Sequence, residues 1–256
     1  MFLIILLFSC KEDEDPFIAY DTRYDEIETL TYDAKGIEEA NIKTVNGNLS
    51  GNPAVDTVIL AEILKSCWGK DLEDAKAHIN DIEIIQGVSI PAHLFSLEAT
   101  MPSDVLWDYS ATIDIDLPDS VELFMTTTNG NVDINSWNSD AFCSTVNGSM
   151  SVLDHQGNLR LLSTNGSIFA STLILDSTMI VELGTSNGDI EINLPPGISA
   201  TFNTGTTNGL VTIEGFSTVE YQVNTPTQKI GKIGNGGAGI QISTVNGSIS
   251  IIARSD

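Results

Sequence analysis

Basic residues are scarce in this chain. Of its 256 residues, 11 are Lys or Arg and 35 are Asp or Glu, so the formal net charge at pH 7 is −24. The phosphate backbone of a nucleic acid is negatively charged and would be repelled by such a protein. The composition therefore excludes DNA and RNA as partners. The hydrophobic content of 41% is enough to bury a core, which excludes a disordered tail.

Histidines and catalytic motifs are also few. His78, His93 and His155 have no metal-ligand partner at helical or hairpin spacing, and the sequence contains no G-x-S-x-G nucleophile elbow. The stretch from Gly234 to Gly239 matches G-x-G-x-x-G, but a strand-like segment follows it where a dinucleotide site needs a helix. We therefore expect a loop there, and we expect no catalytic residue, no metal, no cofactor and no enzymatic activity.

Two acidic pairs, Asp114/Asp116 and Asp189/Glu191, carry the oxygen ligands that calcium prefers and the carboxylates that a glycosidase uses. Each acidic residue alternates with an aliphatic one, as on a strand with one face in water. We interpret both pairs as parts of solvated strand faces.

The chain lacks a hydrophobic run long enough to cross a bilayer as a helix. Phe2 to Phe8, in MFLIILLFSC, is typical of the apolar part of a secretory signal. The cysteine that follows resembles the lipobox of a bacterial lipoprotein, which implies a signal peptide at residues 1–9 and a membrane anchor through lipidated Cys10. The alternative is an ordinary cleaved signal or a frayed apolar end. We expect residues 10–24 to form an acidic tether, and Lys11 to Asp15 resemble the export signal of outer-membrane lipoproteins of the Bacteroidetes.

Cysteine is rare, with three residues in the whole chain. Cys67 and Cys143 could form one disulfide in an oxidising compartment, because the envelope is outside the reducing cytosol. Cys143 occupies an apolar position of the repeat described next, which fits a buried thiol equally well. Both possibilities stay open.

The pair Asn-Gly is unusually frequent. Between residues 129 and 208 it recurs about every twenty residues, and the last interval is about twice that length, which predicts stacked supersecondary units. The copies are Asn46-Gly47, Asn129-Gly130, Asn147-Gly148, Asn165-Gly166, Asn187-Gly188, Asn208-Gly209 and Asn246-Gly247.

Each copy sits in the same local pattern. A Thr or Ser always stands two residues before Asn, and apolar residues stand two and four residues after Gly in nearly every copy. The positions between these apolar residues are polar, except for Phe169 and Leu210. Such alternation predicts a strand with one buried and one solvated face after every Asn-Gly.

Two architectures fit this pattern. Asn-Gly is the strongest short signal for a two-residue β-hairpin turn, which would give an antiparallel meander. It also suits a corner of a β-solenoid, with Asn and Gly in left-handed dihedrals and like residues stacked about 4.8 Å apart. The invariant hydroxyl favours the solenoid, because in a stacked column each hydroxyl can bond the next one along the axis.

The long interval after Asn46-Gly47 predicts an insertion at about residues 53–110. Residues 56–64 and 81–90 are typical of strands, and residues 71–79 of a short helix that Asp71 could cap. Residues 111–117 alternate as a strand that Pro118 ends. The insertion is a candidate cap for one end of the stack.

The order of these segments resembles a known family. VILAEIL followed by DLEDAKAHINDIEI, then ATIDIDLPDSVEL, TTTNGNVDI and the closing IGNGGAGIQISTVNGSISI, is similar to a family of bacterial adhesin-like domains of unknown function, built from β-strand repeats on envelope lipoproteins. The resemblance covers residues 25–254. It implies an all-β, right-handed, single-stranded parallel β-solenoid, and it transfers no catalytic residue.

We therefore expect a non-catalytic lipoprotein of the bacterial outer membrane that presents polar ladders to a polysaccharide, a matrix or a neighbouring cell. The alternative is an envelope-stress sensor or a structural component of a membrane-associated complex. The expected partners are the membrane, through Cys10, and a polysaccharide or protein ligand.

Overall fold

The computed structural model describes residues 19–54, 57–103 and 106–254, and within them the chain is all-β with one short α-helix, α1 (Leu72–His78). The predicted signal peptide and Cys10 lie outside the described residues.

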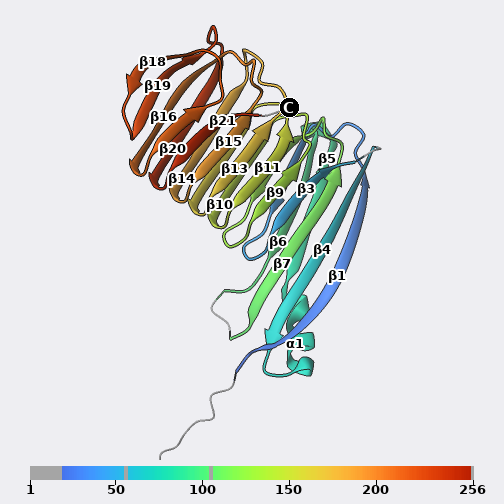
Figure 1. Cartoon of the computed structure of the whole chain (residues 1–256). Coiled ribbons are helices and arrows are strands. Elements are labelled where there is room, and N and C mark those ends of the chain that lie inside the picture. The colour runs from blue at the N-terminus through green and yellow to red at the C-terminus, as the bar shows by residue number, and fades with distance from the viewer. Residues whose placement is uncertain (1–18, 55–56, 104–105, 255–256) are drawn as a thin grey trace, which may run out of the picture.

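Two large mixed sheets contain the strands (Figure 1). Sheet A has the order β1 (Thr22–Asp33), β4 (Val58–Gly69), β7 (Asp108–Leu117), β3 (Leu49–Pro53), β9 (Val132–Asn135), β11 (Met150–His155), β13 (Ile168–Thr172), β15 (Ile190–Leu194), β21 (Ile249–Ala253) and β17 (Val211–Glu214). Sheet B has the order β18 (Val219–Asn224), β19 (Gln228–Ile233), β16 (Ala200–Asn208), β20 (Ala238–Asn246), β14 (Ile180–Asn187), β12 (Leu159–Asn165), β10 (Ala141–Asn147), β8 (Glu122–Thr126), β2 (Glu39–Lys43), β6 (Leu94–Thr100) and β5 (Glu83–Ser89).

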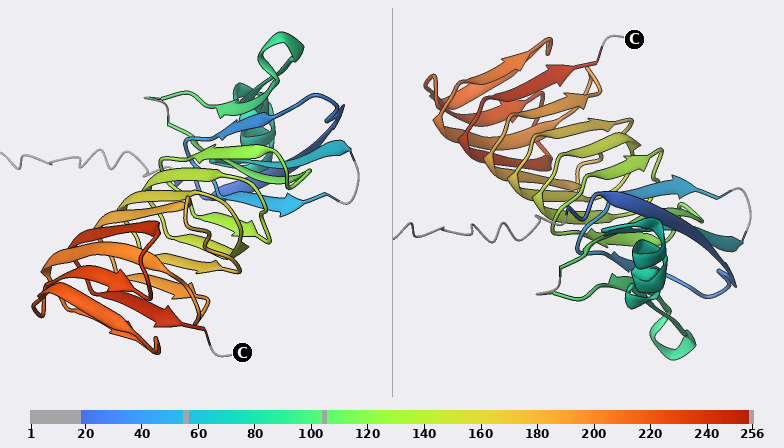
Figure 2. Two further views of the ribbon diagram at one scale, coloured as in Figure 1. Left: turned by 90° about the horizontal axis from the view of Figure 1, so that it is seen from above. Right: turned by 90° about the horizontal axis from the view of Figure 1, so that it is seen from below.

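Every Asn-Gly pair connects the two sheets. The strand before it lies in sheet B and the strand after it lies in sheet A. Neighbouring repeats pair in parallel and in register, as β10 does with β8 and β12, and β11 with β9 and β13. The hairpin-meander alternative is therefore wrong, because the two strands that flank an Asn-Gly pair are not neighbours in one sheet. A rung is defined as one strand of sheet B, its Asn-Gly corner and the following strand of sheet A. The rungs succeed one another along one axis (Figures 1 and 2).

The order of rungs in the stack differs from their order in the chain at both ends. The first rung, β2–β3, lies between β6–β7 and β8–β9, and the last rung, β20–β21, lies between β14–β15 and β16–β17. The double-length interval before residue 246 is filled by the antiparallel hairpin β18–β19, which pairs with β16 at the edge of sheet B. The chain thus turns back and inserts its last rung one place inside the end.

The insertion after the first rung forms the helix-bearing end of the molecule. The helix prediction is confirmed: the Asp74 N–H donates to Asp71 Oδ1 at 2.9 Å, which caps α1, and the helix packs against β1 and β4. A short 3₁₀ helix, η1 (Ile79–Asp81), follows α1, and a second, η2 (Ile90–Ala92), joins β5 to β6. β1 begins at Thr22, so residues 22–24, expected in the tether, belong to a strand. In the part of the chain that the structure describes, no helix is long and apolar enough to span a membrane.

The inward faces of the two sheets form one continuous core. Ile168, Ile190 and Ile249 align in register in sheet A, and Leu161 and Leu183 align in sheet B; all are buried. Each buried aliphatic side chain of this size contributes about 1.5–3 kcal/mol to stability. The predicted alternation of apolar and polar residues is therefore the pattern that brings the two sheets together.

Both described cysteines are buried free thiols, which decides between the two alternatives left open by their spacing. Burial raises the pKa of Cys143 to about 12. Burial, followed by the nearby carboxylates of Asp81 and Asp74, raises the pKa of Cys67 to about 11. Neither thiol is ionised at neutral pH.

Among the described residues, three buried side chains have a polar atom without a hydrogen-bond partner, namely His155, Thr172 and Thr204. Thr204, on β16, is completely buried, and its hydroxyl has no hydrogen-bond partner. An unpaired buried hydroxyl carries a desolvation cost. We expect Thr204→Val to stabilise the protein by about 1 kcal/mol in urea unfolding. Thr206→Val on the same strand is the matched comparison. It removes a 2.8 Å bond to the Gly247 carbonyl, so we expect it to lower the free energy of unfolding. Equal changes in the two variants would contradict the conclusion that the Thr204 hydroxyl is unpaired.

Candidate functional site

The Asn side chains of the corners form a continuous hydrogen-bonded ladder. Asn147 Nδ2 donates to Asn129 Oδ1 at 2.8 Å, and Asn165 Nδ2 donates to Asn147 Oδ1 at 2.8 Å. The ladder continues through Asn187, Asn246 and Asn208 in that order and begins at Asn46, so it follows the stack and not the chain.

The corner glycines are needed for a different reason from the one predicted. Gly47, Gly188 and Gly247 have φ values of 148°, 157° and 153°, far from the left-handed helical region, and no corner Asn has a positive φ. A Cβ at Gly148 would instead lie far inside van der Waals contact with the carbonyl oxygen of Gly130, and the other corners repeat this arrangement. The expectation of left-handed dihedrals is therefore wrong for Asn. The positive φ favours glycine at Gly47, Gly188 and Gly247, and the close approach of successive rungs requires glycine at every corner.

The invariant hydroxyl also has a different partner from the one predicted. Thr145 Oγ1 donates to the carbonyl oxygen of Gly130 at 3.0 Å, and Ser163 Oγ donates to that of Gly148 at 3.0 Å. Equivalent bonds occur at Thr44, Thr127, Thr185, Thr206 and Thr244. The hydroxyl therefore bonds the backbone of the adjacent rung, not the next hydroxyl, and it satisfies a carbonyl group at every corner.

A further column lies immediately after each glycine. The side chain of Asn131 accepts from the Ser149 N–H at 2.9 Å, and Ser149 Oγ accepts from the Ser167 N–H at 3.3 Å. The column continues to Leu210, whose rung, β16–β17, is the last in sheet A. In the described part of the chain no further rung of sheet A offers an N–H there, so a polar side chain at this position would have no such bond to accept.

The outer face of sheet A carries two adjoining hollows, and both are lined by Phe169. We call them together the Phe169 groove; their volumes are about 390 Å³ and about 210 Å³. The larger hollow is lined by Leu153, Asp154, Phe169, Ser171, Asn193, Ile252, Ala253 and Arg254, and the smaller by Asn131, Asp133, Ser149, Met150, Ser151, Ser167 and Phe169. Both apolar and polar side chains therefore line this open groove.

A β-bulge forms one wall of the larger hollow. The pairing of β11 with β13 shifts register between Val152 and His155, and Asp154 within the bulge has a φ of 53°. The Asp154 N–H donates to Ser171 Oγ at 2.9 Å, and Arg254 Nη1 donates to Asp154 Oδ1 at 2.8 Å. A bulge next to a groove redirects a side chain that a regular strand would point elsewhere. Here it holds the Asp154–Arg254 ion pair against the hollow.

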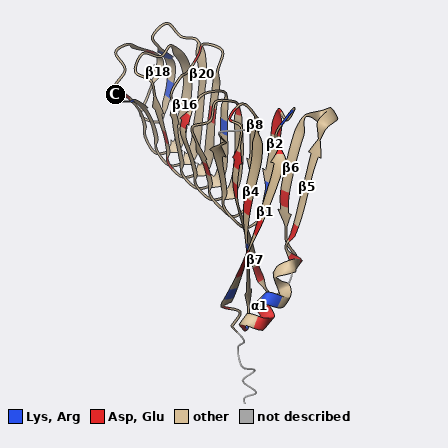
Figure 3. Ribbon diagram, turned by 90° about the vertical axis from the view of Figure 1, so that its right-hand side faces the viewer, with Lys and Arg blue, Asp and Glu red and all other residues tan. Residues whose placement is uncertain are grey.

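The charged side chains that line the groove are two acidic ones, Asp133 and Asp154, and one basic one, Arg254. Asp133 lines the smaller hollow, and its pKa is raised by burial and by the nearby carboxylate of Asp114. Asp114 and Asp116 lie on the outward side of β7, as predicted, and acidic residues are visible along several neighbouring strands (Figure 3). No group of three or more His, Cys, Asp or Glu residues within the described ranges is placed to hold a metal ion.

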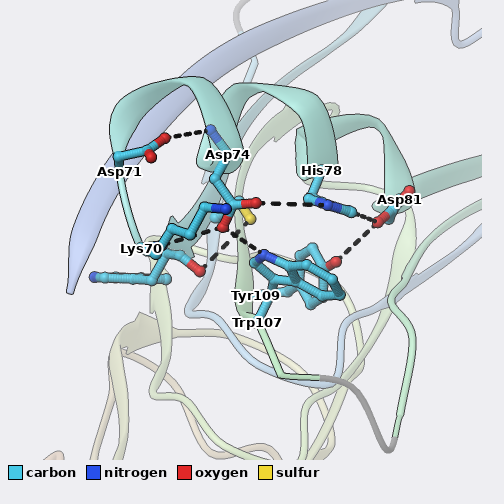
Figure 4. A network of polar contacts seen from close by, with 9 residues as sticks. Lys70, Asp71, Asp74, His78, Asp81, Trp107 and Tyr109 are labelled. Carbon is cyan, nitrogen blue, oxygen red and sulfur yellow. Dashed lines mark hydrogen bonds and ion pairs between the residues drawn. The ribbon is translucent and has the colours of Figure 1, made fainter. Parts of the chain in front are cut away.

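A second cluster of polar side chains lies under α1 (Figure 4). His78 Nδ1 lies 2.9 Å from Asp81 Oδ2, and the His78 ring stacks on Trp107 with 3.8 Å between centroids. Trp107 Nε1 donates to Asp74 at 2.9 Å, and the Tyr109 hydroxyl donates to Asp81 at 2.9 Å. These bonds join α1 to Trp107, the residue before β7, and η1 to Tyr109 in β7. The carboxylates of Asp74 and Asp81 therefore serve as hydrogen-bond acceptors within the protein.

This cluster makes stability depend on pH. The hydrogen bond from His78 lowers the pKa of Asp81, burial opposes it, and the Tyr109 hydroxyl adds to the lowering. A carboxylate with a depressed pKa stabilises the fold above its unfolded pKa of about 3.9 and loses that contribution as the pH falls through its folded pKa. We expect Asp81→Asn to lower the melting temperature at pH 6 and to have little effect at pH 2.5. The same loss at both pH values would contradict this assignment.

Sequence reasoning identified the corners but not the groove. Phe169 was visible as an apolar exception among polar outward positions, which is the one local signal of the groove. Asp154 and Arg254 are 100 residues apart, and nothing in the local sequence predicts their contact. Gly234 to Gly239 forms the turn between β19 and the start of β20, as the absence of a following helix predicted.

Comparison with known proteins supports the fold. No family model matches the chain, and no curated protein matches its sequence. A solved structure described as a "putative cell adhesion protein" from Clostridium sporogenes matches with a TM-score of 0.56 at 15% identity, over 90% of this chain and 100% of that chain. Two structures described as "putative adhesin", from Bacteroides fragilis and Parabacteroides merdae, match 90% of this chain at 14% and 12% identity, covering 97% and 96% of those chains, each with a TM-score of 0.30. The chain therefore shares its fold with the Clostridium sporogenes protein.

Proposed function

We propose that this chain is a non-catalytic, lipid-anchored binding protein of the bacterial cell envelope, whose rungs form a right-handed β-solenoid and whose Phe169 groove binds an extended ligand outside the cell. The groove is the observation that carries the proposal, because it is a concave surface with both apolar and polar groups on a rigid stack of paired strands.

Three further observations support it. The sequence places Cys10 two residues after the end of an apolar run, where a lipoprotein signal has a cysteine. Parallel pairing of successive rungs in register is the arrangement of a β-solenoid. The fold is also that of a protein described as a "putative cell adhesion protein". This likeness is one of fold alone, so the function is argued from the groove.

The test uses intact cells that express the full chain, its Cys10→Ala variant or neither. Protease accessibility and the mass of the peptide that begins at Cys10 report surface exposure and lipidation. We expect the full chain to be lipidated, exposed and able to increase binding of the cells to immobilised polysaccharides or matrix proteins. A full chain that is unmodified at Cys10 and leaves binding unchanged on all of these surfaces would refute the proposal.

A structural role in a membrane-associated complex is the second candidate, favoured by the edge strand β5. Ile85, Val88 and Ile90 at this edge are 54%, 39% and 57% exposed, and Glu83 is the one charged residue of the strand. An exposed edge with a single charged residue can pair with a strand of another protein. Cross-linking from position 85 in cells, with a partner recovered and adhesion unaffected by deletion of the chain, would favour this role.

A further inference from the structure

The Phe169 groove matches the chemistry of a neutral polysaccharide, and we propose that a pyranose ring of such a chain stacks on Phe169. This inference rests on the function proposed above and specifies the ligand class and the residue that contacts it. The ring is the apolar platform, and the neighbouring hydroxyl and amide groups bond the sugar hydroxyls.

The Phe169 ring is accessible from the groove. It lies half-buried on the outward face of β13, next to the small Ser151 on β11 and opposite Glu191 on β15. Both hollows adjoin it. The face of an aromatic ring carries partial negative charge and attracts the weakly positive C–H groups on the face of a sugar ring. A single ring among polar outward residues therefore fixes where one sugar unit sits.

Two exposed serines near the ring are held with their hydroxyls available to a ligand. Ser149 Oγ accepts from the Ser167 N–H at 3.3 Å, and Ser167 Oγ accepts from the Asp189 N–H at 3.2 Å. Ser171, which accepts from the Asp154 N–H at 2.9 Å, is buried and supports the bulge. A hydroxyl that accepts a backbone bond still has its own O–H to donate. The oxygens are thus positioned before binding, which lowers the entropic cost of recognising a sugar.

The negative charge of the protein and of the groove favours a neutral polymer over an anionic one. The chain has a formal net charge of −24, and Asp133 and Asp154 line the two hollows. The Arg254 guanidinium at the groove is bonded to the Asp154 carboxylate, which offsets its charge. A polyanion would therefore meet repulsion at the groove and from the molecule as a whole.

The spacing of the rungs suits a repeating ligand. Neighbouring strands in a sheet lie about 4.8 Å apart, which is close to the length that one hexose adds to an extended chain. A polysaccharide that crosses the strands would meet an equivalent side chain, such as Ser149 and then Ser167, at each successive sugar. The groove thus recognises the repeat with several weak contacts and not with one deep pocket.

The experiment measures binding of the full chain, in detergent, to laminarin, xylan and dextran as neutral polymers and to alginate and heparin as anionic ones. We expect at least one neutral polymer to bind. Phe169→Ala should weaken that binding at least about tenfold, whereas Phe169→Tyr, which keeps the ring, should retain it. Phe142→Ala is the matched control, because Phe142 is also half-buried but stacks on Phe124 on the outer face of sheet B.

The outcomes separate this inference from the proposed function. Neutral-polymer binding that survives Phe169→Ala, or binding of alginate or heparin alone, would overturn the inference and leave a binding role intact. Binding of matrix proteins, with no binding of any polysaccharide, would also overturn the inference and leave a binding role intact. Failure to bind every polymer and protein, together with unchanged cell adhesion, would overturn both. If Phe169→Ala lowers the melting temperature, its binding is compared with that of Phe169→Tyr and Phe142→Ala at a temperature where all three variants are folded, and equal binding by the three overturns the inference.

Discussion

Gly148→Ala is expected to destabilise the protein by at least about 3 kcal/mol and to leave much of it insoluble. The added methyl group would overlap the carbonyl oxygen and carbon of Gly130 and the backbone nitrogen of Asn131. None of these atoms belongs to a flexible side chain, so relief requires two rungs to separate. Separation would lengthen the bond from the Gly130 N–H to the Asn147 carbonyl, now 3.0 Å, and weaken the Asn ladder beside it. Urea unfolding of the soluble fraction measures the loss.

Gly197→Ala is the matched control for this substitution. Gly197 lies in the turn before β16, and a Cβ there would have no atom within 4 Å. We expect its free energy of unfolding to stay within about 0.5 kcal/mol of the parent protein. If Gly148→Ala were equally mild, the corners would not need the close approach that we infer, and glycine would serve there only as a turn former.

The rungs could be predicted from sequence because each one carries its own local signal. The hydroxyl before Asn-Gly, the small residue at the corner and the alternating apolar residues afterwards all lie within one rung. Ile168 and Ile190 were assigned to the buried face from this alternation alone, and both are buried. The hydroxyl at Thr145 was recognised as a stacking feature, although its partner is the Gly130 carbonyl. The repeated motif thus identified residues that contact the neighbouring rung, although it did not identify the atoms that they bond.

The order of the rungs could not be predicted in the same way. All corners present the same bonding groups, so Asn208 and Asn246 compete for the place next to Asn187, and the sequence near each one is alike. The choice depends on the hairpin β18–β19 and on how the chain returns from it, which are properties of the whole end of the molecule. The Asp154–Arg254 pair has the same origin, because it forms only after the last rung has been inserted.

Removal of the inserted last rung is expected to destabilise the C-terminal end of the stack strongly. A chain that ends at Gly237 lacks β20 and β21, and β14, β15, β16 and β17 then each lose a neighbour. The missing segment carries four buried isoleucines, which contribute about 1.5–3 kcal/mol each, against a total stability of about 5–15 kcal/mol for a typical domain. They are Ile240, Ile242, Ile249 and Ile251. We expect the amides of residues 200–233 to lose their protection from hydrogen exchange.

A chain that ends at Arg254 is the control, because it keeps the whole last rung and the 2.8 Å bond from the Arg254 N–H to the Leu194 carbonyl. Its exchange pattern should match that of the full chain. The opposite result for the shorter chain, with residues 200–233 still protected, would mean that β16–β17 closes directly onto β14–β15. The corners would permit this, since Asn208 and Asn246 offer the same ladder groups. Loss of protection would therefore show that the return of the chain, and not the corner bonding, decides the order of the stack.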